Sequence, residues 1–315
     1  MPSVALPCRA TSKPTWRRPS EFILFSIVCL ALSACRPGTQ EAKRLRDSCE
    51  SGISTDCNKF AAKLQKGEYV LKDPKRAAGL FEQTCTAGVG DGCASLGEML
   101  QRGNGVKRDS ARALKLLGRG CELRAMDGCT RLAVLYQKGA GVPRDAARAA
   151  TLFQQACDGG QMAGCAHLGA LYSAGEGVAQ DFQRAATLLT KSCDEKVQLG
   201  CVGLGRLHAA GSGVPHNDST AVKLFRGACD KREPTGCFQL AASFEVGQGV
   251  EQNYTRAAEL YRDTCDERDG ESCAKLSMLY EKGAGVRRSE DRAREFRKRA
   301  CEYGHVESCA KPKGA

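Results

Sequence analysis

The sequence predicts an all-α solenoid, and three observations lead to this fold class. Cysteines recur every 36 residues along most of the chain. Each period holds two stretches in which apolar residues follow the i, i+3, i+4, i+7 spacing of an amphipathic helix. Glycines and an aspartate separate the two stretches, where a helix–turn–helix unit needs a turn and an N-cap. A fixed period of this size is typical of stacked helical repeats.

The cysteines set the register of the repeats. They form two series without insertions, and the members of each pair are spaced as C-x7-C. The first series is Cys49, Cys85, Cys121, Cys157, Cys193, Cys229, Cys265 and Cys301, and the second is Cys57, Cys93, Cys129, Cys165, Cys201, Cys237, Cys273 and Cys309. The solenoid is therefore expected over residues 49–309, with seven full repeats over residues 57–308.

Residues 129–164 illustrate the two helices of one repeat. One face of the first helix carries Cys129, Leu132, Ala133 and Tyr136, and the second helix repeats this spacing at Ala149, Leu152, Phe153 and Ala156. Gly139 and Gly141 supply the left-handed backbone that a tight turn needs. Asp145 is the expected N-cap of the second helix. A small residue that permits close helix approach recurs at Ala61, Gly97, Ala133, Gly169, Gly205, Ala241 and Ser277.

The composition excludes several classes of protein. The chain has 315 residues, of which 42% are hydrophobic and 6% aromatic, so neither a multi-span membrane protein nor an aromatic-rich β-sandwich is expected. Nineteen cysteines favour an oxidising compartment over the cytosol. The net charge of +11 favours an anionic counterpart, which is a lipid head group, a glycan or an acidic protein. Nucleic acid is not expected as a partner, because aromatic stacking platforms are missing.

Residues 1–34 are expected to be an export signal. Four basic residues precede the 13-residue apolar run Phe22–Ala34, which is short for a membrane span. The run ends in Leu32-Ser33-Ala34-Cys35, which resembles the lipobox of bacterial lipoproteins. This resemblance implies cleavage before Cys35 and acylation of that residue, whereas the alternative is a plain secretory signal cut near the same place. Because Arg36 follows the cysteine, rather than an inner-membrane retention Asp, we expect an outer-membrane lipoprotein, facing the periplasm or the cell surface.

Both ends of the array are expected to be capped. Residues 35–48 are predicted to be a lipid-anchored cap, in which Thr39–Cys49 is a lone and mostly polar helix. Residues 310–315 form a C-terminal tail, and Pro312 prevents another regular helix there.

The repeated pattern A/G-x-x-Y/L-x-x-G-x-G-V-x-x-D-x-x-R-A resembles the Sel-like repeat (SLR) family, which is related to the tetratricopeptide repeats. The C-x7-C in every unit resembles the Helicobacter cysteine-rich protein subfamily. The pattern covers 252 of 315 residues in unbroken register. The resemblance implies a right-handed α/α superhelix. The departures are small: Tyr69 stands where a loop glycine belongs, and the Asp cap becomes Asn217, Asn253 and Ser289.

Once Cys8 and Cys29 are removed with the signal and Cys35 is reserved for lipid, sixteen cysteines remain and pair without remainder. A short link between antiparallel helices brings the cysteines of each C-x7-C within disulfide reach, about 5.5–6 Å between Cα atoms. The predicted bridges are Cys49–Cys57, Cys85–Cys93, Cys121–Cys129, Cys157–Cys165, Cys193–Cys201, Cys229–Cys237, Cys265–Cys273 and Cys301–Cys309. Each is worth nominally about 2–3 kcal/mol. Zinc is the competing interpretation, but zinc ligands usually cluster as C-x2–4-C, so neither a metal nor a cofactor is expected.

Several motifs invite a catalytic interpretation. Ser272-Cys273-Ala274-Lys275 and Ser308-Cys309-Ala310-Lys311 match the S-x-x-K motif of serine β-lactamases. Neither S-D-N nor K-T-G accompanies them, and earlier repeats have Gly at the serine position.

Gly103-Asn104-Gly105 follows a helix rather than a strand, so a phosphate-binding loop is not expected there. The four histidines, His167, His208, His216 and His305, show no metal-binding spacing.

The leading hypothesis is a monomeric scaffold that binds a protein or peptide. By analogy with tetratricopeptide repeats, the first helix of each repeat should line the concave surface. The candidate contact residues on these helices are Lys59, Lys66, Arg102, Arg131, Lys138, His167, Arg206, Lys275 and Lys282. A solvated helix face is the alternative interpretation of these residues.

An enzymatic alternative rests on resemblance alone. Members of the cysteine-rich subfamily are commonly described as β-lactamases, and some are associated with penicillin binding or hydrolysis. This implies a penicillin-binding protein or a weak β-lactamase. No nucleophile–base pair stands apart from the repeat pattern, so the sequence assigns no catalytic residue.

Overall fold

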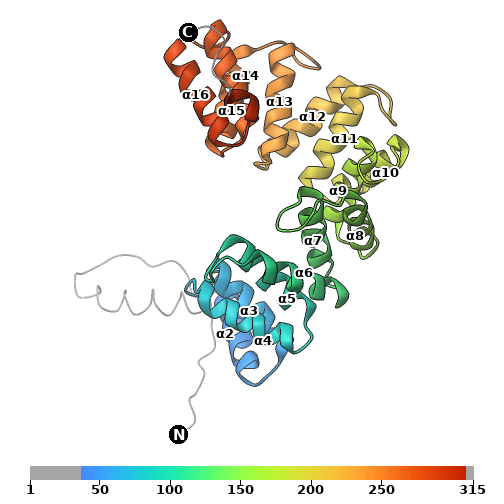
Figure 1. Cartoon of the computed structure of the whole chain (residues 1–315), viewed down its shortest axis with the longest axis vertical. Helices are drawn as coiled ribbons and strands as arrows, with labels where there is room; N and C mark the ends of the chain where they lie inside the picture. The colour runs from blue at the N-terminus through green and yellow to red at the C-terminus, as the bar shows by residue number, and fades with distance from the viewer. Residues whose placement is uncertain (1–36, 310–315) are drawn as a thin grey trace, which may run out of the picture. The chain divides into compact units, whose positions relative to one another are not determined.

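The computed structural model describes residues 37–309, and within this range it contains helices and no strand. Consecutive helices pack in pairs, which confirms the all-α, solenoid-like arrangement (Figure 1). The first helices of the repeats are α3 (Ser54–Lys66), α5 (Gly90–Arg102), α7 (Met126–Lys138), α9 (Met162–Ala174), α11 (Gln198–Ala210), α13 (Pro234–Val246) and α15 (Gly270–Lys282). The second helices are α4 (Pro74–Thr86), α6 (Ser110–Glu122), α8 (Ala146–Asp158), α10 (Phe182–Asp194), α12 (Asp218–Asp230), α14 (Tyr254–Asp266) and α16 (Glu290–Glu302).

The array is flanked by two further helical segments. Helix α2 (Pro37–Glu50) precedes the first repeat, and the 3-10 helix η2 (Val306–Cys309) follows the last. The expected signal over 1–34, the acylated Cys35 and the tail over 310–315 lie outside the described residues. None of the described helices is long and apolar enough to cross a membrane.

An N-cap fixes the start of each second helix. The carboxylate of Asp145 accepts a hydrogen bond from the backbone N–H of Arg148 at 2.9 Å. The same bond is made by Asp73, Asp109, Asp181, Asn217 and Asn253. Ser289 makes it more weakly, at 3.4 Å. The Asn and Ser substitutions therefore keep the capping function, because all three side chains carry an acceptor oxygen.

Each first helix begins three residues before its cysteine. Only Ala87–Val89 separate α4 from α5. Gly88 has a left-handed backbone (φ 85°), and Val89 is extended. The N–H of Val89 bonds to the carbonyl of Thr84 at 2.9 Å, which closes the turn, so that helical geometry resumes at Gly90.

The helix pairs form two compact units, with the boundary inside α7. Unit 1 covers the described residues up to Arg131, and unit 2 begins at Leu132. Within each unit, a second helix packs between the first helices of its own and the next repeat, as α4 packs between α3 and α5, and α10 between α9 and α11. In unit 2 the first helices also contact each other, α9 with α11 and α11 with α13. These helices therefore form a continuous face, which suits the inner side of a helical stack.

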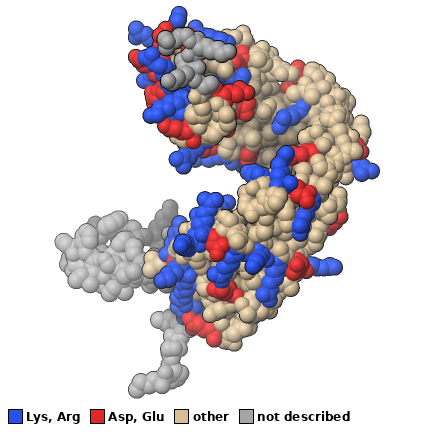
Figure 2. Space-filling model, viewed as in Figure 1, with Lys and Arg blue, Asp and Glu red and all other residues tan. Residues whose placement is uncertain are grey.

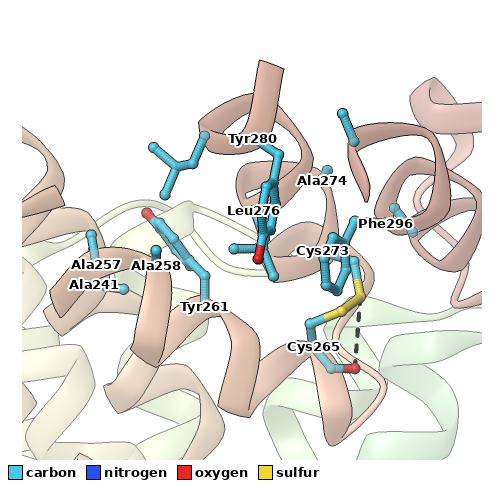
Figure 3. Close-up of a cluster of buried hydrophobic side chains, with 13 residues drawn as sticks. Ala241, Ala257, Ala258, Tyr261, Cys265, Cys273, Ala274, Leu276, Tyr280 and Phe296 are labelled. Carbon is cyan, nitrogen blue, oxygen red and sulfur yellow. Dashed lines mark hydrogen bonds between the residues drawn. A yellow bond between two sulfur atoms is a disulfide. The ribbon is translucent and has the colours of Figure 1, made fainter. Parts of the chain in front are cut away.

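The core lies between the two layers of helices. Large side chains of the second helices, such as Phe81 and Phe153, are fully buried. They face the small residue of the first helix, since a Cβ added at Gly205 would lie 2.6 Å from the Phe225 ring. In the last repeats Tyr261, Leu276, Tyr280 and Phe296 cluster beside the Cys265–Cys273 bridge (Figure 3).

The contact between each loop and the start of the preceding second helix has its two partners exchanged at the N-terminal end of the array. In the second repeat, loop residue Gly105 lies against the start of α4, and a Cβ added there would lie 2.5 Å from the carbonyl carbon of Pro74. In the first repeat the loop residue is Tyr69, with φ 61°, and the matching helix residue is Gly38. A Cβ added at Gly38 would lie 2.4 Å from the Tyr69 ring. The side chain and the glycine have exchanged places, which explains why Tyr69 departs from the repeat pattern.

Candidate functional site

The nine predicted contact residues all lie on first helices, at three positions of the repeat. The first position holds Lys59, Arg131, His167 and Lys275, the second holds Arg206, and the third holds Lys66, Arg102, Lys138 and Lys282. We call the surface formed by these three positions in every repeat the first-helix face. Its two parts, on unit 1 and on unit 2, differ in chemistry.

On unit 1 every candidate is already paired with a carboxylate. The shortest nitrogen–oxygen distances are 3.5 Å for Lys59–Asp56, 3.6 Å for Lys66–Glu68, 3.1 Å for Arg102–Glu98, 3.0 Å for Arg131–Glu98 and 2.5 Å for Arg131–Asp127. Glu98 is the centre of this network, and its side chain is only 18% exposed. Glu98 was not among the site residues predicted from the sequence. Because their charges are compensated locally, these cations offer little to an acidic partner.

On unit 2 the same positions are mostly unpaired or uncharged. Lys138, Arg206 and Lys282 have no ion-pair partner among residues 37–309, and all three are exposed. Lys275 lies 3.4 Å from Glu245, which also accepts a hydrogen bond from the buried Tyr261 hydroxyl at 2.8 Å. Burial, and then the Glu245 carboxylate, raise the pKa of Tyr261, so its hydroxyl remains a donor.

His167 is an aromatic packing residue and not a cation at neutral pH. Its ring stacks on Phe153, with 4.7 Å between centroids and 10° between planes. Burial, and then the nearby Lys138 charge, lower the pKa of His167 to about 4. The structure therefore places this candidate at the edge of the core, where it contributes a neutral ring.

Apolar side chains occupy the middle of the first-helix face on unit 2. Ala170, Ala174 and Ala210 are exposed on α9 and α11, and Val246 on α13 is 64% exposed. Figure 2 shows mostly uncharged surface over α11 and α13, whereas basic and acidic side chains gather over α15 and α16.

Two grooves run between these helices. The first, of about 390 Å³, lies between α9 and α11, and its lining includes Leu171, Leu189, Gly203, Arg206 and Leu207. The second, of about 240 Å³, lies between α11 and α13, and its lining includes Ala209, Val222, Phe225, Ala242 and Val246. Neither groove was predicted from the sequence. A signal was present, since Gly203 stands at the repeat position that elsewhere holds Lys59, Ser95, Arg131, His167, Gln239 and Lys275.

The two S-x-x-K serines are parts of repeat junctions. Ser272 is fully buried, and its hydroxyl lies 2.7 Å from that of Thr264. Ser308 lies in η2, where its hydroxyl is 2.8 Å from Nδ1 of His305. Within residues 37–309 no carboxylate bonds to His305, so this pair lacks the third group that orients a catalytic base. His208 bonds to the Pro215 carbonyl, and His216 pairs with Asp218.

Every repeat carries a disulfide, as expected from the sequence. The bonded pairs in the structure are Cys49–Cys57, Cys85–Cys93, Cys121–Cys129, Cys157–Cys165, Cys193–Cys201, Cys229–Cys237, Cys265–Cys273 and Cys301–Cys309. Their Cα atoms lie 4.4–4.8 Å apart, closer than we expected, because only three residues link the helices. No cluster of metal-ligating side chains occurs in the described range. So many disulfides indicate an oxidising, exported environment.

Comparisons with known proteins agree with this fold. The model of the Sel1 repeat family matches residues 61–89, 90–124, 127–161, 163–197, 199–232, 234–267 and 270–305. Sel1 repeats generally mediate protein–protein interaction. No curated protein matches the chain.

Solved structures with this fold come from several bacteria. A protective antigen of uropathogenic Escherichia coli with an SLR fold is 24% identical, with a TM-score of 0.57 over 85% of this chain. This chain covers 57% of that protein, a little over half its length. A Sel1 repeat protein from Oxalobacter formigenes is 19% identical, with a TM-score of 0.57 over 85% of this chain and 78% of that one. Cysteine-rich protein B of Helicobacter pylori is 28% identical over 41% of this chain and 93% of that one, with a TM-score of 0.35. With seven matched repeats, the chain belongs to the Sel1 repeat family.

Proposed function

We propose that this protein is an exported, membrane-anchored scaffold that binds a protein or peptide through the first-helix face of unit 2. The observation that carries the proposal is the exposed apolar surface of α9, α11 and α13, with its two grooves. Exposed apolar surface of this kind marks interaction sites in soluble proteins. On the opposite face of unit 2, outward positions of the second helices, such as Thr187, Lys223 and Glu259, are instead polar and exposed.

Anchoring is the second part of the proposal. Residues 1–34 would direct export, and acyl chains on Cys35 would hold the cap helix and the repeats at the outer membrane, where two or more chains anchor stably. Replacing Cys35 with Ala should release the protein from membranes and abolish acyl labelling. Unchanged fractionation and labelling of this variant would contradict the anchor and leave a plain secretory signal.

β-Lactam chemistry receives no support from the geometry. The buried Ser272 cannot meet a substrate without opening the repeat junction, and Ser308 has a histidine neighbour that no carboxylate in the described range orients. A scaffold therefore accounts for the arrangement better than a hydrolase.

Site-specific photo-crosslinking in cells tests the binding face. A photo-reactive residue at Ala174, Ala210 or Val246 should form adducts with a partner. The matched second-helix positions, Thr187, Lys223 and Glu259, should form none. All six residues are exposed in unit 2, so accessibility does not separate the two sets. Equal adducts from both faces, or none from the first-helix face, would contradict the proposal.

A further inference from the structure

The lining of the groove between α9 and α11 includes one glycine, Gly203. Gly203 stands on α11 where most other repeats have a polar or basic side chain. Without a side chain there, Leu189 packs directly on the helix, and an added Cβ would lie 2.6 Å from its Cδ2 atom. The floor of the groove is therefore aliphatic, formed by Leu171, Leu189 and Leu207. Its shallow shape fits small aliphatic side chains.

The surface continues past α11 into the second groove. Val222, Phe225 and Val246 line that groove, and α11 lies between the two hollows because it contacts both α9 and α13. A ligand that fills both grooves must cross α11. The polar groups at the edges are mostly engaged, since Glu176 pairs with Arg144 and Glu245 with Lys275.

Among the charged groups that line the grooves, Arg206 is the one without an ion-pair partner in the described range. It is exposed on α11 and lines the first groove. Its guanidinium can donate two parallel hydrogen bonds to a carboxylate. The apolar surface extends to both sides of it, so a bound chain continues in both directions from Arg206. The matching carboxylate therefore belongs to a side chain inside the bound segment and not to a chain terminus.

We propose that the two grooves bind an extended internal segment of a partner protein, with one Asp or Glu at Arg206 and small aliphatic side chains on both sides. This inference rests on the proposed binding function and specifies its ligand. Neighbouring helices pack about 8–10 Å apart, so the path from α9 to α13 is roughly 20 Å, or about six extended residues.

The charges beyond the grooves extend the motif. Lys138 on α7 and Lys282 on α15 are exposed, unpaired cations that lie one first helix beyond the grooves on either side. One further helix spacing corresponds to about three extended residues. Acidic residues about six positions before and after the central one would therefore meet these lysines.

A displayed library of random fifteen-residue internal segments tests the specificity. Selection on the disulfide-bonded full chain should enrich segments with a central Asp or Glu flanked by Ala and Val. The Arg206→Gln variant should bind these segments about threefold to fivefold more weakly, as expected for an exposed ion pair. A capped synthetic peptide with Gln at the central position should bind wild type and variant equally, which assigns the loss to the one pair.

Matched variants control for general effects. Arg226→Gln removes an exposed Arg from α12, on the opposite face of the same unit, and should leave binding unchanged. Ala210→Gln should block the groove, whereas Ala147→Gln, at an exposed position on α8, should not. Enrichment of basic or aromatic segments, no enrichment, or enrichment insensitive to both groove variants would overturn the inference. Crosslinking from Ala174, Ala210 and Val246 would still stand in those cases, so the two proposals fail separately.

Discussion

The first helices of the two units have the same backbone arrangement, but their exposed faces differ in chemistry. On unit 1, Arg102 and Arg131 share Glu98, so the first-helix face is charged and compensated within the chain. On unit 2, the same positions of α9, α11 and α13 carry mostly small or aliphatic residues, with the exceptions of His167, Gln239 and the unpaired Arg206. A partner that binds unit 1 would have to displace existing ion pairs. On unit 2 it could bury exposed apolar surface without breaking an ion pair.

This difference distinguishes positions whose residue type the fold requires from positions whose residue type varies between repeats. Every second helix carries a buried Ala at one position, from Ala77 to Ala293, because the neighbouring helix leaves no space there. The outward position of Gly203 holds Lys, Ser, Arg, His, Gln or Gly in different repeats. Packing constrains the first position more tightly than the second, so binding specificity can vary while the solenoid is preserved.

The largest expected loss of stability comes from glycine substitutions that test whether the same loop–helix contact stabilises both units. In unit 1 Gly105 and in unit 2 Gly177 have positive φ and lie against the preceding second helix, where an added Cβ would be 2.5 and 2.2 Å from backbone carbon. Gly105→Ala and Gly177→Ala should each lower the free energy of unfolding by about 1–3 kcal/mol beyond the cost of their backbone conformation. Urea unfolding with the disulfides intact measures this.

Two other glycines isolate the steric part of that loss. Gly88 and Gly160 also have positive φ, but a Cβ would meet no atom within 4 Å. Their Ala variants should show only the left-handed backbone cost, about 1–2 kcal/mol. Equal losses at clashing and open positions would contradict the inferred contact, and a loss in one unit alone would contradict the shared framework.

The next effect belongs to unit 2 alone. The pKa of His167 is about 4 in the folded protein and about 6.5 in an unfolded chain. Below the higher value the unfolded chain takes up the proton and the folded protein does not. The stability contributed by neutral His167 is therefore complete above about pH 6.5 and is lost as the pH falls toward 4, by roughly 2–3 kcal/mol.

A His167→Gln variant isolates this contribution. Its free energy of unfolding should fall less steeply than that of the wild type between about pH 7 and pH 4.5. Parallel curves for wild type and His167→Gln would show that the stacked ring is not the source of the pH dependence.

A smaller effect tests the charged network of unit 1. Glu98→Gln removes the shared partner of Arg102 and Arg131 and should cost about 1 kcal/mol. The loss should shrink as salt is added, because salt screens the pairs in the wild type. Glu259→Gln removes an exposed partner of Arg256 in unit 2 and should change little. Equal losses for both variants would mean that the unit 1 network is no more stabilising than an isolated surface pair.

Much of the fold could be predicted from the sequence because each repeat restates the same local rules. Asp145 as an N-cap, Gly139 in the turn and the bridge Cys157–Cys165 depend only on residues a few positions apart. The candidate site depends on contacts between repeats. Arg131 is paired by Glu98, 33 positions earlier, so its charge is compensated by a residue that a single repeat does not contain.

The grooves escaped prediction for a related reason. Gly203 appears in the sequence as one more small residue, and only packing shows that Leu189 from another helix moves into the space it leaves. His167 likewise appeared as a polar residue on a binding face. Its stacking on Phe153 requires the two helices to be placed together. Helical periodicity gives the face on which a residue lies, but not what the neighbouring repeat brings to it.

The smallest expected effect concerns Ser272, where the two units can be compared directly. In unit 1 the equivalent residue is Gly92, whose added Cβ would lie 2.1 Å from the Thr84 hydroxyl oxygen. In unit 2 Ser272 occupies this junction and hydrogen bonds to Thr264, which also bonds to the Leu260 carbonyl. Because Thr264 keeps that second partner, Ser272→Ala should cost at most about 1 kcal/mol.

The same variant should leave any β-lactam hydrolysis unchanged, because the Ser272 side chain is fully buried. A chromogenic cephalosporin assay of wild type, Ser272→Ala and Ser308→Ala measures this. In a true S-x-x-K enzyme, loss of the nucleophile removes nearly all transition-state stabilisation at once. Hydrolysis abolished by Ser272→Ala alone would therefore show that the junction opens to substrate, and the scaffold interpretation of unit 2 would have to give way to an enzymatic one.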